Sequence, residues 1–553
     1  MLTDIEIATK AKMKTIDKIA AGLKIKNKYI EPYGKYKAKI NLSIMDELKE
    51  KENGKLILVS AINPTKYGEG KTTTTIGLME AFKEMNVNAI LALREPSLGP
   101  VFGIKGGACG GGYAQVLPME DINLHFTGDM HALTTINNLI CACIDNELYW
   151  GNSLNLDPNK IVFKRCVDLN DRALRTVVIG DDNKNGIKRN DGFNITVASE
   201  VMAAFCLCED LNDFANMIDE AIVGYTVDDK VVRVKDLNIT GSIKVLAKDL
   251  IKPNLVQTLN HAPVLIHGGP FANIAHGCNS LIATKLGLKL ADYCITEAGF
   301  GADLGMEKFF DIKCRKGNLN PNLVVLVATI RALKHHGGCE DANKEDLESL
   351  QKGFANLDKH VENVKKYNLP FVVAINKFSI DTQKEIDLLL KHCHKNGYPV
   401  EINESFAKGA KGAMDLASTV LKLCEEKNNF DYLYDVKDTI ENKIEKIAKE
   451  IYGADNVEYS DAALSSLELI NKNDLNKDLL ICMGKTPMSL SDNEKLIGRP
   501  TGFTLHVKEV RISNSVKFLV VLTGSILTMP GLGKDCAAHK INMDENGKIE
   551  GLF

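Results

Sequence analysis

A strand–loop–helix pattern near residue 60 constrains the fold more than any other feature of this sequence. Residues 56–62 form a short aliphatic and β-branched run that is typical of a buried strand. Asn63 and Pro64 end the run, a glycine-containing loop follows, and a helical pattern begins at Thr72. Residues 89–93 form a second strand. We therefore predict a β-loop-α-β unit, with two parallel strands joined by a right-handed crossover.

Similar apolar runs recur along the chain, with long helical patterns between them. We predict buried strands at residues 176–179, 264–266, 323–327, 371–375 and 518–522, and helices at 198–208 and 437–451. This alternation indicates α/β layers in which helices cover a mostly parallel sheet. No proline- or serine-rich linker and no repeat separates the segments, so we expect tightly packed domains.

The loop before the first helix has the composition of a phosphate-binding loop. Residues 65–72 read T-K-Y-G-E-G-K-T and end in the G-K-T of a Walker A motif, although Thr65 replaces the usual first glycine. Small residues let successive N–H groups converge on phosphate oxygens at the helix N-terminus. Lys71 is the expected partner of the β- and γ-phosphates, and the Thr72 hydroxyl the expected ligand of Mg²⁺.

Two further segments point to a ligand at the same edge of the sheet. Residues 103–113 contain six glycines flanked by apolar residues, which indicates backbone that approaches a ligand or another backbone closely. Arg94 and Glu95 directly follow the second predicted strand. Since ligands bind at the carboxyl ends of parallel strands, we expect Arg94 to face the phosphate loop.

Composition excludes several classes of protein. The 68 Lys and Arg residues against 72 Asp and Glu give a net charge of −4, which argues against a nucleic-acid partner. No signal-peptide core and no run of eighteen apolar residues occurs, so we expect no membrane partner and a cytoplasmic location. Fourteen scattered cysteines lack a C-x-x-C pair, so we interpret them as buried reduced thiols. In His392-Cys393-His394 the two histidines are interpreted as solvated or core residues and not as metal ligands.

These segments resemble one enzyme family, the formate–tetrahydrofolate ligases. The glycine signature of the family resembles residues 103–113, with Cys109 in place of the usual alanine, and its second signature resembles residues 327–338 throughout. Further likenesses extend from about residue 56 to the C-terminus, at residues 93–100, 126–129, 268–280, 296–305 and 528–532.

The resemblance implies an activity and its cofactors. Formate and ATP would give formyl phosphate, and N10 of tetrahydrofolate would then take the formyl group, leaving ADP and phosphate. By family likeness Lys71 and Arg94 hold formyl phosphate, with Glu95 beside them. The ATP phosphates, with Mg²⁺, are assigned to Thr65, Gly68, Glu69, Gly70, Lys71 and Thr72.

The resemblance also implies an aromatic clamp for the pterin ring of tetrahydrofolate. Its positions match Phe378 and Phe406, although the family usually has tryptophan at the second. The only tryptophan here, Trp150, is distant in sequence, so Phe406 is expected to serve with a smaller stacking area. His125, Asp129 and His131 cluster in the sequence around residue 128. A histidine here could accept the N10 proton, and Asp129 could orient the pterin or bind a cation, but no single role is assigned to any of them.

We expect an α/β fold with a P-loop-containing, mostly parallel sheet domain and two further α/β domains. The expected boundaries are residues 1–130 plus 312–360 for the nucleotide-binding domain, 131–311 for an inserted domain, and 361–553 for a C-terminal domain that supplies the folate site. Activation by a monovalent cation, K⁺ or NH₄⁺, and a homotetramer are carried over from the family.

Two other classes of P-loop protein remain open from the residues alone. Lys66, five residues before Lys71, lies where switch ATPases of the MinD/ParA type carry a second lysine. Such a regulator would leave the glycine run and the aromatic positions unused. A different carboxylate ligase, like dethiobiotin synthetase, would share the acyl-phosphate step with another substrate.

Overall fold

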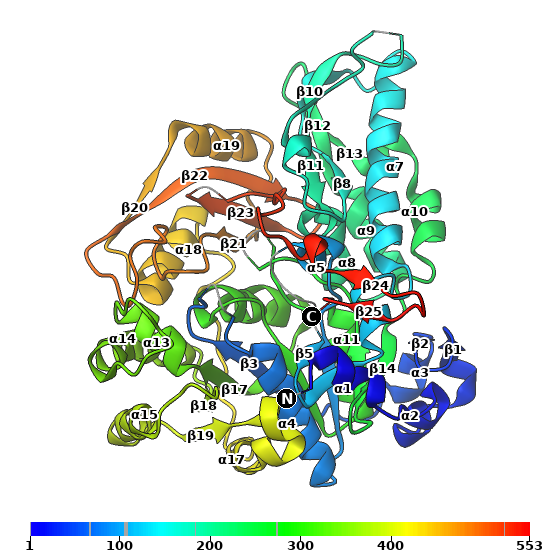
Figure 1. Cartoon of the computed structure of the whole chain (residues 1–553). Helices are drawn as coiled ribbons and strands as arrows, with labels where there is room; N and C mark the ends of the chain where they lie inside the picture. The colour runs from blue at the N-terminus through cyan, green and yellow to red at the C-terminus, as the bar shows by residue number, and fades with distance from the viewer. Residues whose placement is uncertain are drawn as a thin grey trace.

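A large sheet organises the molecule (Figure 1). The computed structural model describes residues 2–65, 68–103, 109–182, 184–272, 275–524 and 526–552. The sheet has twelve strands, of which β5 (Gly110–Gly111) and β6 (Ala114–Leu117) lie off the main path. Along that path the order is β1 (Ile30–Pro32), β2 (Ala38–Ile40), β14 (Asn254–Thr258), β15 (Pro263–Ile266), β4 (Ala89–Leu93), β16 (Tyr293–Glu297), β3 (Lys55–Ala61), β17 (Pro321–Ala328), β18 (Phe371–Asn376) and β19 (Val400–Asn403).

The path from β15 to β19 is entirely parallel, whereas β1, β2, β6 and β14 pair antiparallel. This arrangement confirms the predicted α/β class with a mainly parallel sheet. The two predicted parallel strands are β3 and β4, but they are not neighbours, because β16 lies between them and pairs with both. The crossover through α4 (Lys71–Glu84) therefore skips one strand position.

The two faces of the sheet belong to two separate hydrophobic clusters. Successive side chains of a strand point to opposite faces, so Ile57 and Val59 lie in one cluster and Leu56 and Leu58 in the other. The first cluster includes α4 and α17 (Met414–Leu423). The second includes α11 (Leu281–Leu290), α13 (Ile330–His336), α14 (Leu347–Lys365) and α15 (Gln383–Lys395). Both faces are thus covered, as the apolar strands require.

The N-terminal segment carries three short helices beside strands β1 and β2 of the main sheet. It contains α1 (Asp4–Lys10), α2 (Ile16–Gly22) and α3 (Ile44–Leu48). Ile16, Ile19 and Ala20 of α2 are buried, which fits the amphipathic spacing of this stretch.

A projecting segment follows β6 and holds α7 (Asp129–Tyr149), α8 (Glu200–Leu207), α9 (Leu211–Asp219) and α10 (Thr240–Ala247) (Figure 1). Its short sheets pair β7 (Leu156–Ile161), β12 (Ile222–Thr226) and β13 (Val231–Arg233), and also β8 (Arg165–Val167) with β11 (Phe193–Ile195). The strand predicted at residues 176–179 is present as β9 (Val177–Ile179), but it is not a buried strand of the main sheet. It forms a partly exposed hairpin with β10 (Arg189–Asp191).

The C-terminal segment builds a separate four-stranded sheet in the order β20 (Asn456–Tyr459), β22 (Thr504–Ser513), β23 (Phe518–Thr523) and β21 (Leu480–Gly484). The strand predicted at residues 518–522 is β23. The predicted helix at 437–451 is present as α18 (Ile440–Lys446), which continues into a π-helical turn at Ile447–Tyr452. Helix α19 (Asp461–Lys472) packs on β22.

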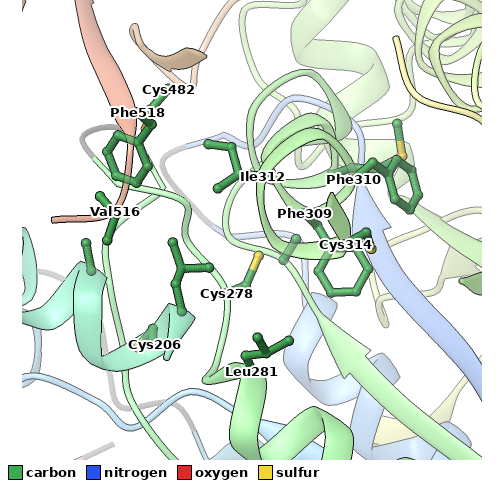
Figure 2. Packing of buried hydrophobic residues seen from close by; sticks show 14 of the residues in the cluster. Cys206, Cys278, Leu281, Phe309, Phe310, Ile312, Cys314, Cys482, Val516 and Phe518 are labelled. Atoms are coloured by element: carbon green, nitrogen blue, oxygen red, sulfur yellow. The ribbon is translucent and has the colours of Figure 1, made fainter. Parts of the chain in front are cut away.

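One of the two hydrophobic clusters extends from the main sheet into the projecting segment and the C-terminal sheet. Figure 2 shows Cys206 of α8, Cys482 of β21, Phe518 of β23 and Ile312 among the residues of this cluster. All four belong to a single buried cluster, which fits the expectation of tight packing between segments. The main sheet takes strands from every predicted domain range: β3 and β4, then β14 to β16, then β17, then β18 and β19. The three-domain division therefore stays a prediction.

Two further observations concern thiols and membranes. All fourteen cysteines lie in the described ranges without disulfides, and all except Cys143 and Cys339 are buried. Burial raises the pKa of most of these thiols, which keeps them protonated and inert. Among the described helices, none combines the length and the apolarity that a bilayer crossing requires.

Candidate active site

The phosphate loop joins the carboxyl end of β3 to the N-terminus of α4. Gly68 and Gly70 have φ angles of 76° and 65°, the left-handed region that glycine adopts without strain. At Gly70, a Cβ would lie 2.2 Å from the Nδ2 of Asn376, so this position also has no room for a side chain. Lys66 and Tyr67 lie outside the described residues, and the switch-ATPase lysine is therefore not placed.

The Glu69 side chain points back into the protein. One carboxylate oxygen accepts hydrogen bonds from the Thr65 N–H at 2.7 Å and the Thr65 hydroxyl at 2.8 Å. The other oxygen accepts from the hydroxyl of Thr329, the residue directly before α13. Glu69 is buried, so its side chain holds the loop in place, and only its main chain remains for the ligand role predicted from the sequence.

Thr72 and Arg94 converge on one carboxylate that the sequence analysis did not single out, and Lys71 contacts the segment directly after it. Glu297, the last residue of β16, accepts a hydrogen bond from the Thr72 hydroxyl at 2.9 Å. Its other oxygen lies 3.8 Å from the Arg94 guanidinium. Lys71 donates to the carbonyl of Phe300, three residues after Glu297, at 3.1 Å. The expected approach of Arg94 to the phosphate loop is therefore present, with Glu297 between them.

Glu297 is positioned by sheet order. Strand β16 lies between β3 and β4, so its carboxyl end separates the phosphate loop from Arg94. The only signal in the sequence was its place before the glycine-rich residues 299–305, which the family resemblance covers.

Glu95 is buried behind Arg94 and does not face solvent. Its N–H donates to the Gly268 carbonyl at 2.8 Å, and a Cβ on Gly269 would lie 2.1 Å from the Glu95 carbonyl oxygen. Burial raises the pKa of the Glu95 carboxyl well above its ordinary value, and the charge of Asp129 raises this pKa further. Burial thus disfavours the charged form of the Glu95 carboxyl.

The three polar residues that the sequence grouped around residue 128 separate in the structure. Asp129 is buried, and its oxygens accept from Lys39 at 2.8 Å and from the Asn254 side chain at 2.7 Å. His125 and His131, in contrast, are exposed. Asp129 thus ties strands β2 and β14 to the start of α7, whereas the two imidazoles remain accessible.

The two aromatic residues follow neighbouring strands. Asn376 and Asn403, the last residues of β18 and β19, stand opposite each other in parallel register. Phe378 is half-buried, and the Arg331 guanidinium lies 4.4 Å from its ring centre. Phe406 lies in α16 (Ser405–Lys408) and is 41% exposed. Both rings therefore lie at the sheet edge that carries the phosphate loop.

The glycine signature packs against one of these aromatic residues. The Phe406 carbonyl accepts a hydrogen bond from the Tyr113 N–H at 2.9 Å. A Cβ on Gly112 would lie 2.1 Å from that carbonyl oxygen, which explains the glycine by close approach of two backbones. Residues 104–108, the other half of the signature, lie outside the described residues.

The second signature supports the phosphate loop from the side of β17. Besides the bond from Thr329 to Glu69, Arg331 donates to the Gly68 carbonyl at 2.8 Å. His336 contacts the Asn63 carbonyl at 3.1 Å, and burial lowers the pKa of this imidazole to about 4, so it is neutral. The signature therefore holds both ends of the loop.

A cavity of about 400 Å³ lies elsewhere, between the projecting segment and the C-terminal sheet. Its lining includes Lys164, Glu200 and Arg511, but it does not include Lys71, Thr72, Arg94 or Glu297. Within the described ranges, no group of three or more His, Cys, Asp or Glu side chains is arranged to hold a metal ion.

Comparison with known families decides between the three classes of protein. The profile of the formate–tetrahydrofolate ligase family matches residues 2–553. The chain belongs to the formate–tetrahydrofolate ligase family. It is an ATP-dependent ligase that joins formate to tetrahydrofolate in one-carbon metabolism. The match spans the chain, so the resemblance of the signatures is confirmed, and neither the switch-ATPase nor the other ligase interpretation is retained.

Proposed function

We propose that the ligase forms 10-formyltetrahydrofolate through a formyl phosphate intermediate at the edge formed by β3, β4 and β16. The observation that carries this proposal is that Thr72 and Arg94 meet at Glu297 while Lys71 contacts the Phe300 carbonyl three residues further on. ATP phosphates bind the loop through Thr65, Gly68, Gly70, Lys71 and Thr72, with Glu69 contributing its main chain. Formate binds beside them, next to Arg94.

The chemistry requires the positive charges of this site. Formate is a poor electrophile, so one of its oxygens first attacks the γ-phosphorus and ADP leaves with the bond electrons. Three anionic groups then lie close together, and Lys71 and Arg94 neutralise the charge that gathers on the transferred phosphoryl group. The planar guanidinium of Arg94 offers paired donors to phosphate or carboxylate oxygens.

The side chains of Thr72 and Glu297 fit a magnesium ion. Hydroxyl and carboxylate oxygens are the donors Mg²⁺ takes, and Mg²⁺ in nucleotide sites needs few protein ligands besides phosphates and water. When bound, the ion supplies charge neutralisation to the phosphate oxygens. Thr72 and Glu297 would hold it, and their mutual hydrogen bond keeps the two oxygens together beforehand.

In the second step N10 attacks the formyl carbon, the carbon–oxygen bond to phosphate breaks, and phosphate leaves. Phe378 and Phe406 hold the pterin by stacking on its faces. The N10 proton requires an acceptor, for which the exposed imidazoles His125 and His131 are the candidates. Glu95 and Asp129 act from the protein interior: the main chain of Glu95 holds the segment that bears Arg94, and the Asp129 carboxylate joins β2 and β14 to α7. The monovalent cation and the homotetramer are carried over from the family.

An isotope experiment tests the intermediate. With ¹⁸O-labelled formate, the oxygen that attacks phosphorus stays with phosphate after formyl transfer, so one ¹⁸O should appear in inorganic phosphate. Reactions lacking ATP, formate or tetrahydrofolate in turn serve as controls, with the product measured after acid cyclisation. Product formation without label in phosphate would exclude formyl phosphate and leave the ligase activity intact.

A further inference from the structure

Two buried asparagines stand between the phosphate loop and the aromatic residues. Asn376 and Asn403 end neighbouring strands, directly before the segments that carry Phe378 and Phe406. Their exposed fractions are 3% and 0%. A buried amide that loses a partner pays its full desolvation cost, so the bonds of these two side chains fix their surroundings.

The hydrogen bonds of the two amides form a continuous chain. Asn403 Nδ2 donates to Asn376 Oδ1 at 3.1 Å and to the Thr74 hydroxyl of α4 at 3.0 Å. Asn376 Nδ2 in turn donates to the carbonyl of Glu69 in the phosphate loop at 3.1 Å. The missing side chain of Gly70 leaves the space that this last contact occupies.

Asn403 also contacts both aromatic segments, one through its side chain and the other through its main-chain carbonyl. The Ser405 N–H donates to Asn403 Oδ1 at 3.3 Å, and the Lys377 N–H donates to the Asn403 carbonyl at 3.0 Å. Ser405 packs tightly on α4: a Cβ built on Gly77 of that helix would lie 2.2 Å from the Cβ of Ser405. A displacement of the phosphate loop would therefore be passed to both aromatic segments through these contacts.

We propose that Asn376 and Asn403 are positioning residues that couple nucleotide binding to folate binding. The inference rests on the function proposed above. A nucleotide that immobilises the loop fixes the Glu69 carbonyl, the amides then hold the segments of Phe378 and Phe406, and tetrahydrofolate binds with less loss of conformational entropy. Since such coupling is reciprocal, folate raises nucleotide affinity by the same factor. One net hydrogen bond corresponds to a factor of about three to ten.

The test measures the dissociation constant of tetrahydrofolate by anaerobic titration calorimetry, with and without saturating ADP and Mg²⁺. We expect ADP to tighten binding about three- to tenfold in the wild-type enzyme, and ADP affinity to rise equally with folate. In Asn376→Ala and Asn403→Ala this ratio should fall close to one. The double variant should show no further loss, because both residues act in one chain.

Two further variants separate coupling from general stability. Asn363→Ala is the matched control, because Asn363 is as buried as Asn403 and donates one bond to the Ile451 carbonyl, away from the site. It should keep the full ratio. Thr74→Val is nearly isosteric and removes the acceptor of Asn403, so it should lower the ratio even if an alanine variant fails to fold.

The outcomes are distinguishable from those of the proposed function. A wild-type enzyme that turns over but shows no tightening by ADP overturns the coupling, and so do Asn403→Ala and Thr74→Val variants that retain the wild-type ratio. A wild-type enzyme that forms no 10-formyltetrahydrofolate in the component-omission assay overturns the proposed function, and the coupling with it. In Asn376→Ala and Asn403→Ala, a rise in the KM of tetrahydrofolate with unchanged kcat supports the coupling.

Discussion

Removal of the Glu69 carboxylate should disable nucleotide binding without any contact between this side chain and the nucleotide. The carboxylate accepts three hydrogen bonds, two from Thr65 and one from Thr329, at a buried position. Hydrogen bonds to a charged group contribute about 1.5–3 kcal/mol each, and partial relaxation of the loop lowers the sum to about 3–4 kcal/mol. That energy corresponds to a loss of about 10²- to 10³-fold in the population of the binding-competent loop.

Titration calorimetry with ADP and Mg²⁺ measures this loss directly for Glu69→Ala. Glu69→Gln keeps an acceptor for Thr65 but lacks the charge, so we expect about a tenfold weaker affinity. Glu84→Ala, at an exposed position at the end of α4, the helix that follows the loop, is the control. If Glu69→Ala binds ADP within threefold of the wild type, the carboxylate does not organise the loop and the reasoning is wrong. A lower melting temperature with normal affinity would lead to the same conclusion.

Three further predictions concern chemistry, folate and pH. Lys71→Ala should lower both ADP formation and formyl transfer by about 10²- to 10³-fold in a coupled assay, and near-normal turnover would contradict its phosphate role. Phe406→Ala should raise the KM of tetrahydrofolate while ADP binding survives, and Phe406→Trp should lower that KM about fivefold by adding about 1 kcal/mol of stacking. Burial raises the pKa of Glu80 from 4.5 to about 7 in the folded protein. As the pH rises, the unfolded chain therefore loses this proton at a lower pH than the folded protein does. The free energy of unfolding should fall by about 3 kcal/mol between pH 4.5 and pH 7. Glu80→Gln should therefore raise the melting temperature at pH 8 but not below pH 4.5, and equal gains from Glu84→Gln would refute this assignment.

The elements with strong local patterns were predictable from the sequence. Local signals predicted the strand at 56–62, the glycine loop and the helix after it. Residues adjacent in the sequence set the apolar run of the strand, the conformation of the turn and the start of the helix. The same holds for β17, β18 and β23, whose apolar runs are continuous. Residues 176–179 show the limit of this signal, since a short apolar run also suits an exposed hairpin.

The sequence by itself determined the family, the α/β class and the residues at the carboxyl ends of β3 and β4. Only the tertiary structure decided that β16 lies between those strands and brings Glu297 to Thr72 and Arg94, because strand order depends on contacts between distant segments. It also turned Glu69 inward and separated Asp129 from the exposed His125 and His131. A side chain's direction depends on which neighbours satisfy its polar atoms, and those neighbours, Thr329 and Lys39, are far away in the sequence.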